Sequence, residues 1–220
     1  MKRLLILLTL SCVFSTLVHA TTLTLQPDAG TGLDVSVRSD APTVNQGTVA
    51  VIPVGEHNGA VGQVWRALIK FTGISALSTT ATIIDEVYLK LYIGADYSSN
   101  SRTVHVYRLL KDWVEAEATW NVYSTGNAWT AAGAFDPTDC EQTDIGSVSV
   151  ADTATGWVTI PLTLPTKDVS GFGDYGFLVK VDTETDDLFS HISSDHATPS
   201  LRPQLVVIYH LRGNAVMGVR

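Results

Sequence analysis

The stretch Val87-Tyr88-Leu89-Lys90-Leu91-Tyr92-Ile93 decides the fold. Its aliphatic residues stand at every second position, with two tyrosines and a lysine between them. A period of two places one set of side chains on one face of a β-strand and the other set on the opposite face. The stretch therefore predicts a strand whose aliphatic face is buried in a core and whose tyrosines and lysine point outward.

Two neighbouring stretches show the same alternation, residues 65–71 and residues 103–107. If all three strands lie in one sheet, their outward side chains form one surface, because residues of a common face lie side by side across a sheet. Tyrosines beside cations suit flat ligands that are rich in hydroxyl or acidic groups. We therefore predict a ligand-binding surface made of Arg66, Lys70, Tyr88, Lys90, Tyr92, His105 and Tyr107.

The rest of the chain consists of short β-branched and aromatic runs broken by Gly, Pro, Asn, Asp and Ser, which is typical of an all-β sandwich or barrel. No window of about 11 residues or more sustains a helical period. About 200 residues follow the N-terminal segment, enough for a single domain with a sizeable core. Further strands are expected at residues 23–25, 35–37, 48–54, 157–162, 175–181, 188–192 and 205–209.

Residues 1–20 have the pattern of a secretory signal peptide. Lys2 and Arg3 precede an apolar run, and Val18-His19-Ala20 forms a small-residue cleavage site. We therefore expect a secreted protein with one domain over residues 21–210 and a flexible tail over residues 211–220. Lipidation at Cys12 is an alternative, although Thr9-Leu10-Ser11 matches the usual lipoprotein pattern poorly. No other run approaches the ~18 apolar residues of a membrane span.

The charge balance is acidic, with 14 basic and 22 acidic residues and a formal net charge of −8. Such a chain does not favour nucleic acid as a partner. The charges are also segregated, since residues 66–111 carry an excess of three basic residues, whereas residues 112–195 carry fifteen acids against Lys167 and Lys180. The basic segment is either a recognition surface or a set of solvated strand faces. Cys140 is the single cysteine after residue 20, so no internal disulfide is expected.

Carboxylates suggest two kinds of site. Asp112, Glu115 and Glu117 lie in one short turn, whereas the acid and base of a glycosidase converge from separate elements, so no enzyme activity is expected. Residues 182–187 carry carboxylates at a spacing that a calcium loop can use, and the alternative is a solvated turn. The predicted metal ligands are Asp182, Glu184, Asp186 and Asp187, with Asp28, Asp34, Asp40 and Asn45 as a weaker second set, and no other cofactor is expected.

The tryptophans divide between core and loop. Trp113 and Trp120 flank the turn of residues 113–121 and are expected to close one end of the sandwich, because large aromatic side chains are mostly core material. The long irregular region 122–146 follows, and a loop of that length is usually functional or packed down as a lid. Trp129 lies there among polar residues, so we predict that it stacks on a sugar ring, with inward packing as an equal alternative.

Several stretches together resemble the DNRLRE domain family, which overlaps carbohydrate-binding module family 96 and is related to the disaggregatase repeat. The resemblance is carried by residues 66–71, 87–92 and 104–108, by Trp113-x-Glu115-x-x-x-Thr119-Trp120-Asn121, and by residues 129–133, 175–180, 193–195 and 202–205. It implies a jelly-roll-like antiparallel β-sandwich, an extracellular setting and non-catalytic binding of polysaccharide, with acidic glycans such as alginate among the targets. The alternative is a self-associating structural or adhesive subunit of a cell-surface or virion assembly, suggested by the apolar tail segment Ala215-Val216-Met217.

Overall fold

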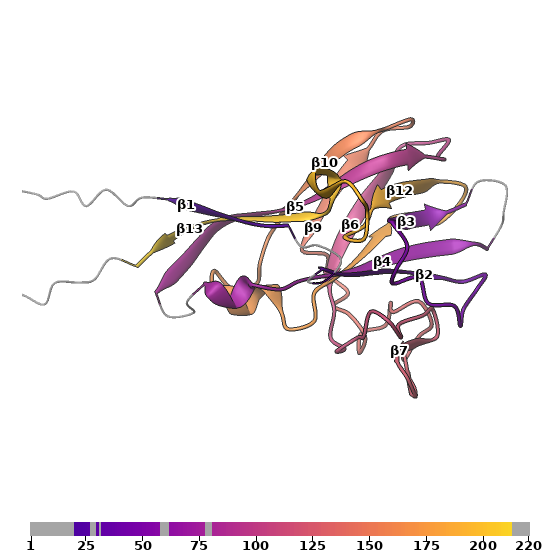
Figure 1. Cartoon of the computed structure of the whole chain (residues 1–220), viewed down its shortest axis with the longest axis horizontal. Helices are drawn as coiled ribbons and strands as arrows, with labels where there is room; N and C mark the ends of the chain where they lie inside the picture. The colour runs from indigo at the N-terminus through magenta and orange to yellow at the C-terminus, as the bar shows by residue number, and fades with distance from the viewer. Residues whose placement is uncertain (1–19, 27–29, 31, 58–61, 78–80, 213–220) are drawn as a thin grey trace, which may run out of the picture.

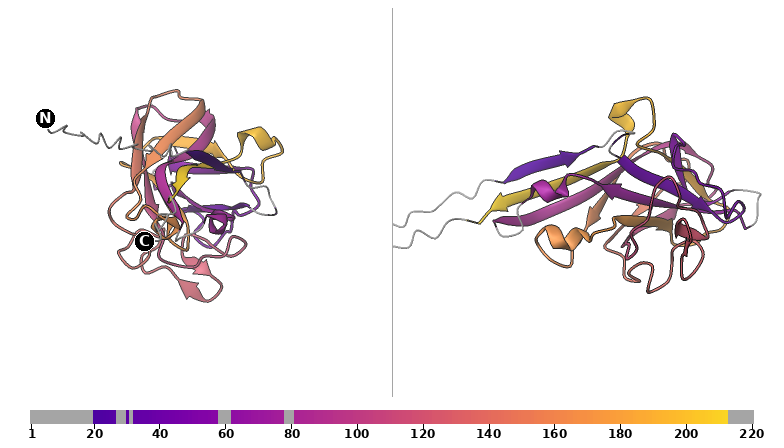
Figure 2. Two further views of the ribbon diagram at one scale, coloured as in Figure 1. Left: turned by 90° about the vertical axis from the view of Figure 1, so that its left-hand side faces the viewer. Right: turned by 60° about the horizontal axis from the view of Figure 1, so that its bottom comes forward.

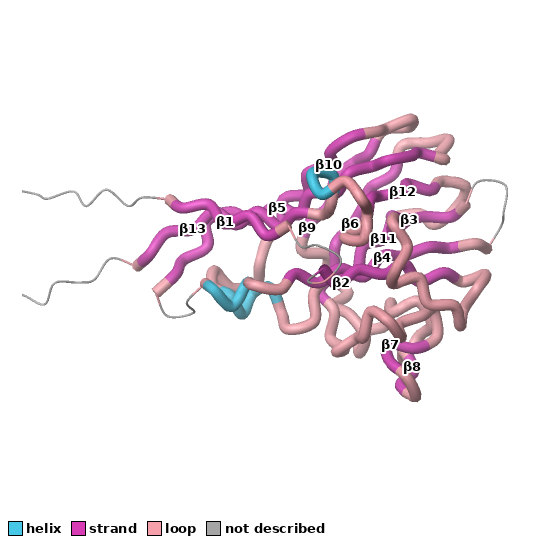
Figure 3. The backbone as a smooth tube through the Cα atoms, in the orientation of Figure 1, coloured by secondary structure: helices cyan, strands magenta, loops and turns pink. Residues whose placement is uncertain are grey.

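The computed structural model describes residues 20–26, 30, 32–57, 62–77 and 81–212 (Figure 1). Apart from Ala20, the predicted signal peptide lies outside the described residues, as do Cys12, Asp28 and the tail from residue 213. The described residues form no α-helix, only three short 3₁₀ segments (Figure 3). None of these helical segments is long and apolar enough to cross a membrane. The prediction of an all-β fold is confirmed.

Thirteen strands are present among the described residues. The first six are β1 (Thr21–Leu25), β2 (Gly32–Arg38), β3 (Val51–Glu56), β4 (Val64–Phe71), β5 (Thr82–Asp96) and β6 (Arg102–Arg108). The others are β7 (Val122–Ser124), β8 (Asn127–Ala128), β9 (Gly146–Val150), β10 (Gly156–Leu162), β11 (Phe177–Val181), β12 (Leu188–Ile192) and β13 (Gln204–Leu211). The 3₁₀ segments are η1 (Ile74–Ala76), η2 (Val169–Phe172) and η3 (Pro199–Leu201). Every predicted strand overlaps an observed one, whereas β7, β8 and β9 were not predicted.

In the described part of the chain, eleven strands form one curled antiparallel sheet. Its main path runs β1-β13-β5-β12-β3-β4-β11-β6-β9, with β10 on β5 and β2 on β4. The curl brings β5, β10 and β13 over β4, β6 and β11, and side chains from both halves line one core. The result is a β-sandwich (Figures 1 and 2).

The core confirms the alternation read from the sequence. Leu89 and Leu91 of β5 are fully buried, and they face Val104 and Val106 of β6 within the same cluster. Full burial of an aliphatic side chain contributes about 1.5–3 kcal/mol relative to exposure, so the odd-numbered face of β5 is a main source of stability. At the far end, β1, β13 and the first residues of β5 extend beyond the sandwich as a three-stranded ribbon (Figure 2).

A second hydrophobic cluster lies outside the sandwich, between the sheet and residues 110–145. We call residues 110–145 the loop layer. Leu68 of β4, Leu109 after β6 and Leu178 of β11 pack there against Trp113 and Trp129. The indole N–H of Trp113 donates to the carbonyl of Tyr175 at 2.8 Å. The loop layer therefore covers the outer face of β4, β6 and β11. Of the two alternatives for the loop of residues 122–146, functional or packed down, the structure shows the packing.

Candidate functional site

The strand-face residues predicted to form one surface lie on two different faces. Arg66, Lys70, His105 and Tyr107 point into or beside the loop layer, whereas Tyr88, Lys90 and Tyr92 lie on the outside of the other half of the sheet. The prediction of a single surface is wrong because the sheet curls around the core. β5 lies in one half of the sandwich and β4 and β6 lie in the other, so their outward faces point in opposite directions.

Arg66 is held inside the protein. Its guanidinium donates to both carboxylate oxygens of Glu184, at 2.7 and 2.8 Å, and to the carbonyl of Gly133 at 2.7 Å. The guanidinium carbon lies 5.0 Å from the centre of the Trp120 ring. A side chain with these partners and 12 % exposure fixes the loop layer and is not free to bind a ligand.

The other residues on that side also have internal partners. Tyr107 is buried and packs edge-on against Phe135. Nδ1 of His105 lies 2.7 Å from a carboxylate oxygen of Asp144. Lys70 keeps more exposure, with its ammonium 3.4 Å from Asp112.

Trp129 is a core residue. It is 4 % exposed, its indole N–H donates to the carbonyl of Thr119 at 2.9 Å, and its ring lies 5.4 Å from that of Tyr123. No face of the ring is open to a sugar, so the prediction of stacking on Trp129 is wrong. The polar neighbours in the sequence belong to the hairpin of β7 and β8, whose turn projects outward while the indole packs inward.

The basic segment is largely neutralised by the acidic one. Arg66, Lys70, Arg102 and Arg108 pair with Glu184, Asp112, Asp187 and Glu141, respectively. The Glu141 carboxylate beside Arg108 raises the pKa of that guanidinium. Charges that are segregated along the chain therefore meet in the fold, and four of the six cations of residues 66–111 are engaged in ion pairs.

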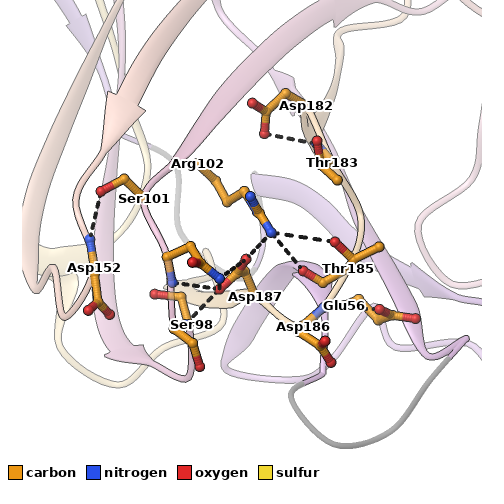
Figure 4. A network of polar contacts seen from close by, with 12 residues as sticks. Glu56, Ser98, Ser101, Arg102, Asp152, Asp182, Thr183, Thr185, Asp186 and Asp187 are labelled. Atoms are coloured by element: carbon orange, nitrogen blue, oxygen red, sulfur yellow. Dashed lines mark hydrogen bonds and ion pairs between the residues drawn. The ribbon is translucent and has the colours of Figure 1, made fainter.

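The carboxylates of Asp182, Asp186 and Asp187 point to different places (Figure 4). Asp187 is fully buried, pairs with Arg102 at 2.5 Å and accepts hydrogen bonds from the backbone N–H groups of Ser99 and Asn100. Asp182 accepts from the N–H groups of Thr103 and Thr183. Because Glu184 is occupied by Arg66, the geometry contradicts a shared calcium site at Asp182, Glu184, Asp186 and Asp187.

The described residues of the second set of predicted metal ligands, Asp34, Asp40 and Asn45, have different partners. Asp40 pairs with Arg38, whose guanidinium holds the pKa of that carboxyl below its usual range. The Asn45 amide donates to the carbonyls of Glu115 and Ala118. Among the described members of this set, Asp34 is the one that meets other carboxylates, and these come from distant parts of the chain.

An exposed aromatic surface remains on the outer face of β5 and β10. Tyr92 lies opposite Trp157, and Lys90 lies opposite Thr159, so these four side chains share one face. The Trp157 side chain is 38 % exposed, and the Tyr92 ring meets it edge-on at 5.5 Å. The Lys90 ammonium lies 5.0 Å from the centre of the Trp157 ring. With Tyr88, opposite Pro161, these residues form what we call the aromatic platform.

Lys90 is the cation of this platform, and it forms no ion pair with any residue that the structure describes. The hydroxyl of Tyr88, in contrast, donates to Glu86 two positions earlier on β5. The platform thus combines an exposed indole, a phenol edge and an ammonium group without an acidic partner. Trp157 was not among the predicted binding residues, although the alternation of residues 157–162 already placed it on the outward face.

A concave site lies elsewhere, between η1, η2 and the ends of β4 and β11. It encloses about 400 Å³ and is lined by Lys70, Asp174 and the apolar side chains of Phe71 and Phe172, among others. It is an apolar cleft with one basic and one acidic residue at its lining, and it is separate from the aromatic platform.

Comparison with known protein families identifies the family of the chain. The family model of carbohydrate-binding module family 96 matches residues 26–209, which is nearly all of the sandwich. No curated protein matches the chain. The match confirms the resemblance predicted from the sequence motifs, and the chain belongs to carbohydrate-binding module family 96.

Proposed function

We propose that this protein is a secreted, non-catalytic module that binds an extracellular acidic polysaccharide through the aromatic platform. Membership of a carbohydrate-binding family supports recognition of a glycan. The observation that carries the choice of site is the exposed Trp157 ring with the unpaired ammonium of Lys90 beside it.

The chemistry of the platform fits a sugar ring bearing a carboxylate. The apolar C–H face of a pyranose packs on an indole, which supplies a large rigid contact area at low entropic cost. An ammonium held next to that ring can donate to ring hydroxyls or pair with a carboxylate on the same sugar. Because the platform lies on a sheet face and not in a cleft, it suits an extended chain rather than a small enclosed ligand.

A binding role also fits the carboxylates near the proposed site and in the turn of residues 112–117. Glu86 accepts a hydrogen bond from the hydroxyl of Tyr88, and Glu117 accepts one from the backbone N–H of Thr125. Glu115 accepts the backbone N–H of Asp34. Each of these three carboxylates is held by a hydrogen bond within the fold, which fits a structural role.

Affinity electrophoresis against alginate, pectin and neutral glucans tests the proposal. We expect the wild-type protein to be retarded by an acidic glycan, and Trp157→Ala and Lys90→Ala each to weaken binding by about tenfold, or about 1.4 kcal/mol. Lys111→Ala is the matched control, because it removes the same charge from the loop layer, where Lys111 lies 5.9 Å from the Tyr123 ring. Retardation by no glycan, or equal binding by all three variants, would contradict the proposal.

The preference for an acidic glycan has its own test. If Lys90 pairs with a carboxylate, Lys90→Ala loses more affinity for alginate than for a neutral glucan, and wild-type binding to alginate weakens as salt is added. If Lys90→Ala loses the same affinity for both glycans, the platform is still the binding site, but the proposed preference for an acidic glycan is contradicted.

A further inference from the structure

Three carboxylates from distant parts of the chain meet at the edge of β2. Asp34 lies in β2, Glu115 in the first turn of the loop layer, and Asp195 after β12. One oxygen atom of each lies within 4.8 Å of the others. The stretches around Glu115 and Asp195 are two of those that carry the family resemblance, so motifs about 80 residues apart converge here.

Two buried polar atoms at this point, one from Asp34 and one from Ser194, have no hydrogen-bond partner among the described residues. Asp34 is 2 % exposed, and while its Oδ2 accepts from the backbone N–H of Ser194 at 2.7 Å, its Oδ1 accepts from no group. Ser194 is 1 % exposed, and its hydroxyl, which lies beside the Asp34 carboxyl, makes no hydrogen bond of normal geometry. Buried polar atoms without partners are costly, which makes a ligand at this point favourable.

The pKa values of the three carboxyl groups also favour a bound cation. Burial raises the pKa of Asp34 to about 7, and the neighbouring Glu115 and Asp195 carboxylates add to the rise. Burial also raises the pKa of Glu115 and of Asp195. Arg202 is the cation that acts on Asp195 in the opposite direction. Three carboxylates held together at this cost are stabilised by a multivalent cation.

We propose that Asp34, Glu115 and Asp195 form a calcium site, with the Ser194 hydroxyl as a further oxygen ligand. Calcium binds oxygen ligands at 2.3–2.6 Å, so two oxygens on opposite sides of the ion are separated by up to about 5 Å, which accommodates the observed spread. Magnesium is usually held by one or two carboxylates together with waters, whereas three carboxylates meet here, which favours calcium. Glu115 and Asp195 are only partly buried, which leaves a path by which the ion enters.

The proposed ion joins three elements that hydrogen bonds already link. Glu115 already accepts the backbone N–H of Asp34 at 2.8 Å, and the Asn45 amide donates to the Glu115 carbonyl at 2.6 Å. A calcium ion at the side chains adds a link from β2 and the loop layer to the turn at Ser194. Its role is to hold the loop layer on the sheet, and none of its ligands belongs to the aromatic platform.

Calorimetric titration of calcium into protein freed of metal with EGTA tests this proposal, together with thermal unfolding. We expect one ion per chain and a rise in Tm of about 5–10 °C when calcium exceeds its Kd a hundredfold. Asp34→Asn and Glu115→Gln should each weaken calcium binding at least about tenfold and abolish the rise. Glu117→Gln is the matched control from the same turn and should respond as the wild type does, because Glu117 binds only the Thr125 N–H in this region.

Several results would overturn the proposal: no heat and no rise in Tm at millimolar calcium, or an undiminished rise in both Asp34→Asn and Glu115→Gln. An equal response to magnesium would overturn the choice of calcium. If Asp34→Asn does not fold, Glu115→Gln and Asp195→Asn decide the question, since both side chains are partly exposed and tolerate an isosteric amide.

Discussion

At the scale of single residues, exposure separates the roles of Trp129 and Trp157, which stand at 4 % and 38 %. Trp129→Ala should cost about 3–5 kcal/mol in the free energy of unfolding, because it removes a buried aromatic ring and leaves the Thr119 carbonyl without its donor. Trp157→Ala should change that free energy by about 0.5 kcal/mol or less, as surface substitutions usually do. Urea denaturation measures both values. A costly Trp157→Ala would mean that its ring is structural.

His191 gives the protein a pH-dependent stability. It is fully buried in β12, and neither ring nitrogen makes a hydrogen bond of normal geometry with the described residues. Burial lowers its pKa to about 4, and the nearby backbone of Ile52 and Phe189, with the Asp96 carboxylate, offsets this effect only in part. The unfolded chain binds a proton near pH 6.5, whereas the folded chain does not until about pH 4. The contribution of His191 is therefore complete above about pH 6.5 and is lost as the pH falls, by about 3 kcal/mol in total.

The prediction for His191 is checked by urea denaturation at a series of pH values. The free energy of unfolding of the wild type should fall more steeply between pH 6.5 and pH 4 than that of His191→Leu, which cannot titrate. Only the difference between the two slopes counts, because other groups titrate in both proteins. Parallel slopes would show that His191 takes up its proton at the same pH in the folded and the unfolded chain, which contradicts the prediction.

At the scale of elements, the loop layer explains why outward strand residues are not all exposed. The alternation of β4, β6 and β11 shows correctly which side chains point away from the sandwich core. It cannot show that residues 110–145 then cover those side chains, because the loop layer has no period and makes its contacts through single residues. Lys180 of β11 illustrates this: its ammonium donates to the Val181 carbonyl and lies 5.0 Å from the Phe135 ring, with the residue 8 % exposed.

Gly133 lies where the loop layer closely approaches the Arg66 side chain of β4. Its φ is +85°, and an added Cβ would lie 2.6 Å from the Trp120 ring and 2.7 Å from the Arg66 guanidinium. Gly133→Ala should therefore destabilise the protein by about 1–3 kcal/mol, through backbone strain and displacement of the loop layer. Gly126→Ala is the control, since it has a similar φ of +79° and no atom within 4 Å of the added Cβ. Equal losses in thermal unfolding would attribute the effect to φ alone.

At the scale of the whole molecule, local sequence patterns predict the strands, whereas pairing between distant strands determines which side chains form the candidate site. Alternation over seven residues is enough to identify β5 and its two faces. The neighbours of β5 are not local, since β10 and β13 follow it by more than 60 and 100 residues. The same distance hid the ion pairs, because Arg66 meets Glu184 only after the sheet has curled. The family could be recognised from the sequence because the resemblance rests on many motifs along the chain and not on the arrangement of one face.

The sequence did not predict that other carboxylates meet Asp34, and the reason is again the distance along the chain. Asp34 could be singled out from its sequence neighbourhood, but its true partners, Glu115 and Asp195, lie about 80 and 160 residues further along the chain. Each belongs to a different element, and no spacing rule connects them. Sequence spacing detects metal ligands that share one loop, as in an EF-hand, and not ligands that meet across a sheet edge.

The central claim is that the aromatic platform binds the glycan, and NMR titration of the isotopically labelled protein with an oligomer of uronic acid tests it most directly. We predict that chemical shifts change at the Trp157 indole N–H and at the backbone of Tyr88, Lys90, Tyr92 and Thr159, with little change in the loop layer. Shift changes centred on the cleft at Lys70 and Asp174, or no changes at millimolar oligosaccharide, would contradict the claim.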